Sequence, residues 1–522
     1  MPEPITRTGV KTRAAGNDFR PPGQTVVTVV VGLALVKLLI HFSTNGNYGY
    51  FRDELYYIAC SDHLAWGYVD QPPLSIAILA VTRALLGDSI FAIRLPVVLC
   101  GALCVVLTGL LARLLGGGRY AQGLAALAYL VTATTLAMAS FFSMNAFDLL
   151  FWLLCMHIVV RLLQSGDTRW WLLLAVVAGV GMLNKYSVAF CVIGLITGVA
   201  LTPSRHLMRS GRLVVGGGLA ALLFLPHLWW EAANGFPTSE FIRNATAHKI
   251  VAMSPAAFFT AQVVENNPFT APLWLAGLGS LLFAPRLRRF RPLGLMYLIV
   301  FLILVLQQAK PYYLAPAYPA LLAAGAVAAE RLRWRWVRVA AAVWLVLGGV
   351  TVGTLAIPAL PPATYVSVIE LLGVKAPQEE RGHTAAMPQV LADRFGWENM
   401  TATIARVYHA LPAEQQARAA ILAGNYGEAA AVDFFGPRYG LPKAISGHNN
   451  YWLWGPHGTT GAVVIAVGIP EADLEKYCAG VDRSDTIISP YALPFETNLP
   501  VYVCRDLRIP IEQAWPLLRQ FI

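Results

Sequence analysis

The sequence predicts an α-helical polytopic membrane protein with a C-terminal water-soluble α/β domain. Of its 522 residues, 57% are hydrophobic and only 13% are charged, which is about half the charged fraction of ordinary soluble domains. A soluble chain could not bury that much apolar surface, so a water-soluble protein is excluded. The apolar content also excludes a disordered chain, and seven cysteines are too few for a small disulfide scaffold.

The balance of charge divides the chain near Ile357. Up to that residue there are 27 Lys and Arg against 13 Asp and Glu, and beyond it 12 against 16. We therefore expect an N-terminal tail over 1–23, a membrane domain over 24–357 and a soluble domain over 358–522. The basic residues lie in short loops beside apolar runs, so the pI near 9.3 does not indicate a nucleic-acid partner.

Apolar runs long enough to cross a bilayer predict about 11–13 transmembrane helices. The eleven that can be placed cover 24–44, 92–112, 120–139, 144–160, 170–184, 187–203, 213–230, 268–284, 292–309, 311–329 and 337–357. Lys37 lies inside the first of these, where we expect its side chain to reach the head groups.

Arginine clusters in alternate loops predict the topology. They are Arg7 to Arg20 with Lys11, Arg113 and Arg119, Arg161 and Arg169, Arg205 to Arg212, Arg286 to Arg291, and Arg331 to Arg338. With eleven spans all six clusters fall on one side, which is then cytoplasmic. The N-terminus would be cytoplasmic, and the C-terminal domain and the long loops 43–91 and 231–267 would lie outside a cell (inner) membrane. Most acids of the membrane domain fall on that outer face, which indicates that function lies there.

The C-terminal third alternates short apolar strands with helical patterns, which is typical of a small α/β domain. Expected strands are 419–422, 462–467, 486–488 and 501–504, and expected helices are 397–411, 429–435 and 511–521. Gly424-Asn425-Tyr426-Gly427 is not a dinucleotide fingerprint and no P-loop occurs, so an ATP-driven pump is not supported.

Three acids on the outer side are candidates for chemistry. Asp53 and Glu54 begin a predicted helix just after the first span, and neighbouring carboxylates on a helix point about 100° apart, so they would have different roles. A carboxylate there could act as general base toward a hydroxyl group, or the pair could be a solvated loop. Asp148 lies a turn into an apolar span, where an acid is costly unless it is a carboxylate stabilised by the helix N-terminus.

Cations and cysteines complete this set. Lys185 and Lys310 lie at outer ends of spans and would either bind a phosphate or reach the head groups. No metal-ligand spacing is evident, so no cofactor is certain; a divalent metal ion held by Asp53 and Asp148 is conceivable. Cys478 and Cys504 are the only cysteines of the outer domain, which makes a disulfide between them plausible.

Four short motifs resemble the GT-C class of polyprenyl-phosphate-sugar-dependent glycosyltransferases, in the clan of dolichyl-phosphate-mannose protein mannosyltransferases and aminoarabinose transferases. They are Phe51-Arg52-Asp53-Glu54-Leu55-Tyr56-Tyr57, Tyr68-Val69-Asp70-Gln71-Pro72-Pro73-Leu74, Asn145-Ala146-Phe147-Asp148 and Lys310-Pro311-Tyr312-Tyr313-Leu314-Ala315-Pro316. They occur in order on the predicted outer face. The run Ser446-Gly447-His448-Asn449-Asn450-Tyr451 further resembles the external domain of bacterial members, without implying a role.

The resemblance implies a sugar donor on a polyprenyl monophosphate and an active site on the outer face. Asp53 would be the general base, Asp148 a second carboxylate, and Lys310 with Lys185 would hold the phosphate. Tyr313, Arg52 and Asp70 of the same motifs are further candidates for binding substrate. Aminoarabinose transferases tend to have Glu-Lys-Pro-Pro where this chain has Asp70-Gln71-Pro72-Pro73, which argues against assuming lipid A as acceptor.

The scheme is chemically consistent. A phosphate is a good leaving group that needs only cations, and one base would complete an inverting displacement onto a protein, lipid or glycan hydroxyl group. One alternative is a transporter or flippase of a lipid-linked sugar, but no internal repeat is visible and the ionisable residues lie at the ends of spans. A non-catalytic scaffold would leave the buried Asp148 unexplained.

Overall fold

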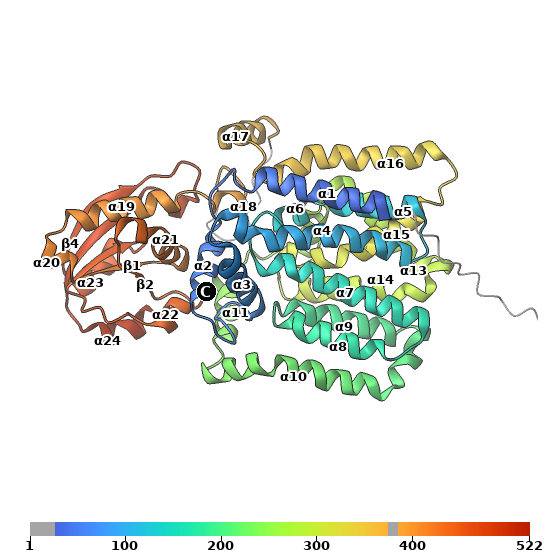
Figure 1. The fold of residues 1–522 in the computed structure, drawn as a ribbon, viewed down its shortest axis with the longest axis horizontal. Coiled ribbons are helices and arrows are strands. Elements are labelled where there is room, and N and C mark those ends of the chain that lie inside the picture. Colours follow the sequence, from blue (N-terminus) through green and yellow to red (C-terminus); the bar gives the residue numbers. More distant parts are fainter. Residues whose placement is uncertain (1–26, 374–384) are drawn as a thin grey trace, which may run out of the picture.

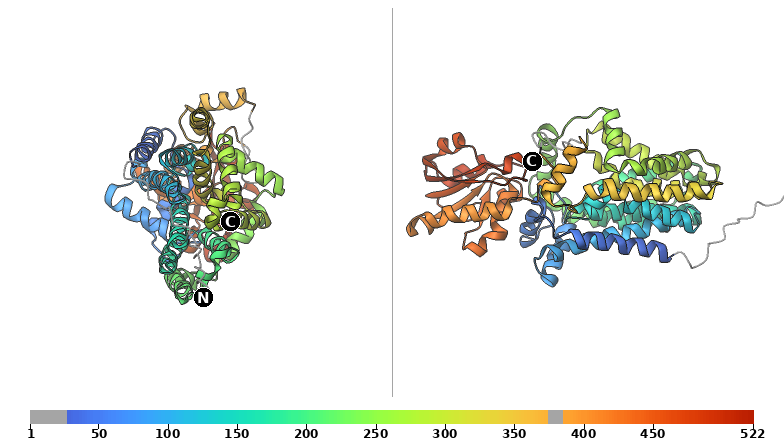
Figure 2. Two further views of the ribbon diagram at one scale, coloured as in Figure 1. Left: turned by 90° about the vertical axis from the view of Figure 1, so that its right-hand side faces the viewer. Right: turned by 90° about the horizontal axis from the view of Figure 1, so that it is seen from above.

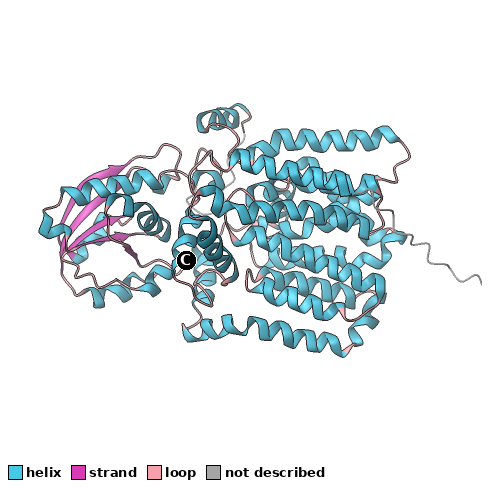
Figure 3. Cartoon of the chain, in the orientation of Figure 1, coloured by secondary structure: helices cyan, strands magenta, loops and turns pink. Residues whose placement is uncertain are grey.

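A computed structural model describes residues 27–373 and 385–522. The expected tail over 1–23 and its basic cluster therefore lie outside the described residues. Long helices run side by side in an elongated bundle, and the strands form one sheet in a domain at one end of it (Figure 1; Figure 3). The molecule is a multi-pass membrane protein with a small α/β domain, as the sequence predicts.

Helices occupy every one of the predicted apolar ranges. They are α1 (Val27–Thr44), α4 (Ile90–Leu114), α5 (Arg119–Leu130) with α6 (Ala133–Met138), α7 (Met144–Ser165), α8 (Trp170–Met182), α9 (Ser187–Ala200), α10 (Gly211–Ala233), α13 (Ala271–Phe283), α14 (Arg291–Leu306), α15 (Tyr318–Ala329) and α16 (Arg335–Gly348). In the described chain, six helical segments are long and apolar enough to cross a membrane, or seven if the bent pair Ser187–Ala200 and Pro203–Arg209 is one span. Others are shorter apolar helices, such as Trp170–Met182.

Two features shorten the helices. Pro311 and Pro316 turn the start of one predicted span into the 3-10 helix Pro311–Ala317 before α15 begins, because proline lacks the N–H that an α-helix requires. Thr132 has extended backbone and separates α5 from α6. Fewer helices are therefore long enough to count as membrane spans than there are apolar runs in the sequence.

The loops with arginine clusters share one end of the bundle. The loops from α9 to α10 and from α15 to α16 lie at the end away from the sheet (Figure 1), and the view from above shows the same separation (Figure 2). The short helices α2 (Arg52–Asp62), α3 (Leu74–Leu86), α11 (Pro237–His248) and α17 (Pro362–Leu371) lie at or near the other end (Figure 1). This end contacts the α/β domain. Helix α12 (Pro255–Glu265) contacts the 3-10 helix that precedes α15, where Gln262 donates a hydrogen bond to the Pro311 carbonyl.

Lys37 does not reach the head groups as expected. Its side chain is fully buried, and Nζ donates a hydrogen bond to the Thr135 carbonyl at 3.0 Å. The carbonyl is available because it lies in the short helix α6, next to the helix end. Local polar backbone thus replaces water as the partner of the ammonium group.

The sheet of the α/β domain has the strand order β2-β1-β3-β5-β4. Strand β1 (Ala419–Ala423) pairs in parallel with β2 (Ala444–Ser446) and β3 (Val463–Val467), and β5 (Leu499–Leu507) pairs antiparallel with β3 and β4 (Cys478–Ile487). The sequence predicted the core strands β1, β3 and β5. It missed β2, which is three residues long, and most of β4, whose residues are largely polar and exposed.

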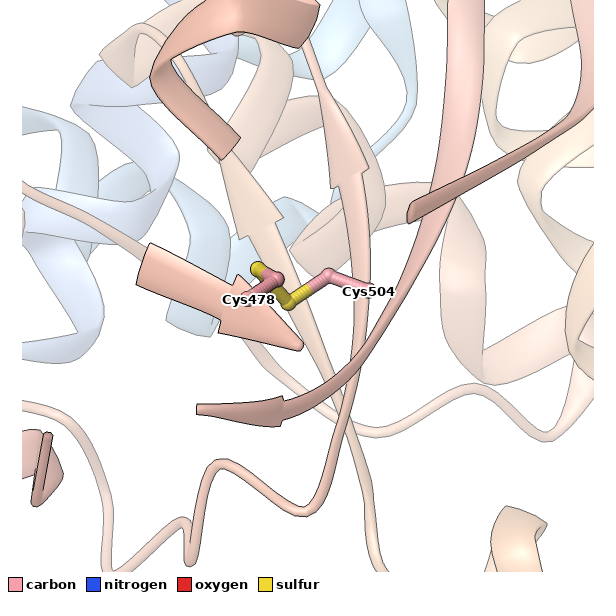
Figure 4. The surroundings of a disulfide bond; sticks show 2 residues. All are labelled: Cys478 and Cys504. Atoms are coloured by element: carbon pink, nitrogen blue, oxygen red, sulfur yellow. A yellow bond between two sulfur atoms is a disulfide. The ribbon is translucent and has the colours of Figure 1, made fainter. Parts of the chain in front are cut away.

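Helices α19 (Trp397–Ala410) and α21 (Tyr426–Phe435) were predicted closely, whereas the expected helix 511–521 is divided into α24 (Ile511–Ala514) and a 3-10 turn by Pro516. The remaining short helices are α18 (Gln389–Ala392), α20 (Ala413–Gln416), α22 (Asn450–Trp454) and α23 (Glu471–Tyr477). Cys478 and Cys504 are joined by a disulfide that links β4 to β5 (Figure 4). The other five cysteines are free and buried.

Candidate active site

Helix α2 carries the first motif and is fixed at its start by Glu54. The carboxylate accepts hydrogen bonds from the backbone N–H of Phe51 at 2.8 Å and of Phe142 at 2.6 Å. Arg94 of α4 donates from Nε at 2.8 Å and from Nη2 at 2.6 Å. Glu54 is fully buried and both its oxygens are occupied. This arrangement supports a framework role for Glu54 and does not support the catalytic role that the sequence suggested.

Asp53 is placed differently. One oxygen, Oδ1, accepts a hydrogen bond from the Tyr426 hydroxyl at 2.8 Å and lies 3.9 Å from Nε of Arg52. The other oxygen makes no hydrogen bond to any described residue, and the side chain is 35% exposed. Asp53 therefore has a held oxygen and an available one, as a proton acceptor requires.

Asp70 lies in the loop between α2 and α3, near Asp53. The Tyr56 hydroxyl donates to its Oδ1 at 3.0 Å, and the amide oxygen of Asn450 in α22 lies 3.2 Å from the same hydroxyl. Burial, followed by the negative charge of Asp53, raises the pKa of Asp70 to about 7. The two carboxyl groups therefore interact electrostatically, although Asp70 is buried and Asp53 is partly exposed.

A second group forms where α8 ends and α9 begins. Lys185 lies in this break. Its Nζ is 3.8 Å from Oδ2 of Asp148 and donates a hydrogen bond to the amide oxygen of Asn145 at 2.7 Å. The hydroxyl of Ser187, the first residue of α9, donates to Oδ1 of Asp148 at 2.5 Å. Asp148 is buried one turn into α7, and the ammonium group of Lys185 balances its charge.

The Lys310 motif joins this second group. The ammonium group of Lys185 lies 4.6 Å from the ring centroid of Tyr313 and 5.7 Å from that of Tyr312, a distance typical of cation–π contacts. Lys310 lies two residues before Tyr312, at the start of the 3-10 helix Pro311–Ala317, and is partly exposed. The arrangement gathers a cation, two aromatic rings and a carboxylate from three separate segments of the chain.

Tyr57 connects the two groups. Burial, followed by the charges of Asp53 and Asp70, raises the pKa of its hydroxyl well above the usual value, and the hydroxyl interacts with the backbone of Met144. The carbonyl of Met144 in turn accepts a hydrogen bond from Asn184 at 2.9 Å. The backbone of Met144 therefore has Tyr57 and Asn184, the residue next to Lys185, as partners.

Several residues of this region come from the α/β domain and its linker, and sequence reasoning missed them. Tyr426 contacts Asp53, Asn450 contacts Tyr56 and the backbone of Val69, and Asp393 contacts Arg52. Asn450 lies in one quoted motif, and Tyr426 lies in the Gly424–Gly427 run that was considered only as a nucleotide loop. Their contacts span several hundred residues of sequence, so no local pattern indicates them.

The described residues give no support to the divalent metal ion. Among them, no group of three His, Cys, Asp or Glu side chains is arranged to hold one. Asp148 is engaged by Lys185 and Ser187, and Asp53 by Tyr426. The two carboxylates thus belong to different groups.

Comparison with known proteins supports the resemblance. The model of the dolichyl-phosphate-mannose-protein mannosyltransferase family matches residues 70–230. ArnT from Cupriavidus metallidurans bound to undecaprenyl phosphate superimposes with a TM-score of 0.60 and 16% identity, covering 91% of this chain and 97% of that one. The chain has an ArnT-like GT-C fold. The apo form of the same ArnT gives a TM-score of 0.58, with the same identity and coverage.

A more distant match has the same general architecture. The Archaeoglobus fulgidus oligosaccharyltransferase in complex with Zn and sulfate gives a TM-score of 0.50 and 12% identity, over 84% of this chain and 68% of that one. No curated protein matches the sequence. At these identities the likeness establishes the GT-C fold and leaves the substrates to be argued from the residues.

Proposed function

We propose that this protein is a membrane glycosyltransferase that moves a sugar from a polyprenyl-phosphate carrier to a hydroxyl group of a protein, lipid or glycan acceptor on the outer face of the inner membrane. The observation that carries the proposal is the state of Asp53. One oxygen is held by Tyr426, and the other, in a partly exposed side chain, is available. Such a carboxylate can take the proton of an acceptor hydroxyl group as the new glycosidic bond forms.

The phosphate would be bound by the second group. A departing polyprenyl phosphate needs positive charge and hydrogen-bond donors in a site that excludes water. Lys185, together with Tyr313 and the neighbouring Lys310, offers these donors, while Asp148 holds Lys185 in place. Undecaprenyl phosphate is the molecule bound to the structurally similar ArnT, which supports the choice of carrier.

The proposed displacement takes place in one step. The acceptor oxygen attacks the anomeric carbon, the bond from that carbon to the phosphate oxygen breaks, and the proton moves to Asp53. A single displacement inverts the configuration at the anomeric carbon. The arginine clusters at the end of the bundle away from the sheet support a cytoplasmic position for that end, so that the acids face outward.

The test uses purified protein in nanodiscs with a panel of radiolabelled polyprenyl-phosphate sugars and cell-envelope extract as acceptor. We expect wild type to release sugar from one donor and Asp53→Asn to bind that donor without consuming it. Asp62→Asn is a suitable control, because Asp62 lies on the same helix and pairs with Arg83 at the surface. Equal turnover by Asp53→Asn and wild type would reject Asp53 as base, and no turnover of any donor would reject the transferase proposal.

Two further measurements test the finer points. The anomeric configuration of the product, read by NMR couplings, should be opposite to that of the donor. Single cysteines placed at Ser204 and at Thr459 should be labelled by impermeant maleimide from opposite sides of inner-membrane vesicles. Retention of configuration, or labelling from one side, would overturn the corresponding part of the proposal. No feature of the described residues favours the alternative of a flippase.

A further inference from the structure

Asp53 accepts a hydrogen bond from Tyr426 of the α/β domain, although the two residues are 373 positions apart in sequence. From this contact we infer that the outer domain completes the catalytic site, with Tyr426 and the Arg52–Asp393 pair as positioning residues for Asp53. The inference rests on the proposed function and assigns a role to a domain that would otherwise be accessory.

Tyr426 is held rigidly, as a positioning residue must be. It is the first residue of α21, whose start is capped by Asn425: the amide oxygen accepts from the N–H of Gly427 at 2.8 Å and of Glu428 at 3.0 Å. Glu428 reciprocates by accepting from the N–H of Asn425 at 3.2 Å, which completes a capping box. The backbone N–H of Tyr426 donates to His448 at 3.3 Å.

The ring of Tyr426 is also fixed. It packs against the ring of Tyr56 in α2, with centroids 4.6 Å apart, and the guanidinium group of Arg52 lies 5.5 Å from its centroid. The backbone N–H, the ring and the hydroxyl of Tyr426 each have a partner, so the hydroxyl is held beside Oδ1 of Asp53. The available oxygen of Asp53 is thereby directed as well.

Arg52 lies between two carboxylates, one from each part of the chain. Its Nη2 is 3.4 Å from Oδ2 of Asp393, and its Nε is 3.9 Å from Oδ1 of Asp53. A methyl group on Gly427 would come within 2.5 Å of Cγ of Arg52, so only glycine admits this side chain against α21. Asp393 is fully buried at its side chain and draws the charge of Arg52 away from Asp53.

Two substitutions should therefore have opposite effects on the protonation of Asp53. Tyr426→Phe keeps the ring but removes a donor to the carboxylate, so the acidic limb of the pH profile of kcat/KM should move up by about one pH unit. Asp393→Asn removes one of the carboxyl groups that share the charge of Arg52, which also interacts with the buried Glu428 and Glu496. More of that charge then acts on Asp53, so the limb should move down. The KM for the donor should stay within about twofold in both, because neither residue belongs to the proposed phosphate group.

Tyr502→Phe is the matched control, since this tyrosine donates to the Glu471 carboxylate at 3.3 Å in the same domain and should leave the profile unchanged. A profile of Tyr426→Phe that superimposes on wild type would overturn the inference. If Tyr426→Phe fails to fold, as judged by its melting temperature, the pH profile of Asp393→Asn is the test, and an unchanged acidic limb would overturn the inference.

A second readout separates this inference from the proposed function. A water-soluble carbodiimide labels carboxyl groups in their protonated form, so the pH at half-maximal labelling of Asp53, measured by mass spectrometry, needs no turnover. Opposite shifts of this pH in the two variants would support the positioning role even if no donor is consumed by wild type. Unchanged labelling in both variants, with transfer intact, would overturn the positioning role and leave the transferase proposal standing.

Discussion

Arg94 and Glu54 form a completely buried ion pair: Nη2 of Arg94 lies 2.6 Å from Oε2 of Glu54, and neither side chain is exposed. The pair joins α4 to the start of α2. Arg94 also donates from Nη2 to the Gly49 carbonyl at 3.0 Å, so it ties the segment before α2 to the bundle as well. The helix that presents Asp53 is held at its base by this pair.

Removing either partner should destabilise the protein strongly. Arg94→Met and Glu54→Gln each leave an unbalanced group in a buried site, which costs about 3–5 kcal/mol. The double variant Arg94→Met/Glu54→Gln should lose clearly less than the sum, because no lone charge remains. Thermal unfolding of each variant in detergent measures the loss of stability.

An exposed pair serves as the control for that experiment. Arg438 and Glu398 are 3.1 Å apart with side chains more than 60% exposed, so Arg438→Ala should cost less than about 1 kcal/mol. Additive effects at Arg94 and Glu54 would contradict the coupling.

Lys185→Met should impair donor binding. If Lys185 binds the phosphate of the carrier, the KM for the donor should rise at least about tenfold, since a charge-assisted hydrogen bond contributes about 1.5–3 kcal/mol. Lys476→Met is the control, because this lysine lies on the exposed surface and pairs with Asp473 at 2.7 Å. An unchanged KM would exclude Lys185 from the phosphate site.

Asp70 gives the stability a pH dependence. Its pKa is raised by burial from 3.8 to about 7, so the folded state binds the proton more tightly than the unfolded state does. The stability contributed by this group is therefore full at low pH and is lost as the pH rises from about 4 to about 7.

Asp70→Asn replaces the titrating carboxyl group by a neutral amide and so tests this pH dependence. The variant should be more stable than wild type at about pH 8, and its melting temperature should fall less between about pH 4 and pH 7. Part of the slope should remain, because burial also raises the pKa of Glu428 to about 7. If the melting temperatures of variant and wild type change by the same amount between about pH 4 and pH 7, Asp70 is not the source of the pH dependence.

The disulfide should stabilise the α/β domain specifically. Cys478 and Cys504 are 26 residues apart, and closing a loop of that length contributes about 3–4 kcal/mol in the chain-entropy model. Cys478→Ser/Cys504→Ser should therefore lower the unfolding temperature of this domain. Reductant should have the same effect on wild type and none on the double variant, whereas an equal response of both proteins would show that another thiol is responsible.

The sequence was sufficient for the helical bundle, because apolar runs and arginine clusters report directly on a bilayer. It was also sufficient for the central strands, whose residues are buried on both faces. It failed at β2 and β4: β2 is too short to show a pattern, and β4 is an edge strand with mostly exposed side chains. Lys37 was misjudged because its partner, the Thr135 carbonyl, lies 98 residues away.

The candidate site was only partly accessible to sequence. The motifs singled out Asp53 and Asp148 as candidate acids, but a motif does not show which carboxylate has both oxygens occupied by neighbouring groups. Glu54 and Asp53 are adjacent in sequence, yet Glu54 is fully occupied by Arg94 and two backbone N–H groups, whereas Asp53 keeps one oxygen available. That difference depends on long-range packing.

The contact between Tyr426 and Asp53 bears on how the protein is made. Asp53 is synthesised early and enters the membrane hundreds of residues before Tyr426 leaves the ribosome. With the proposed topology, the outer domain must cross the membrane and fold before its tyrosine can reach the acid. A nascent chain would hold donor lipid beside an unfinished site, so sugar transfer would begin only after export of the outer domain is complete.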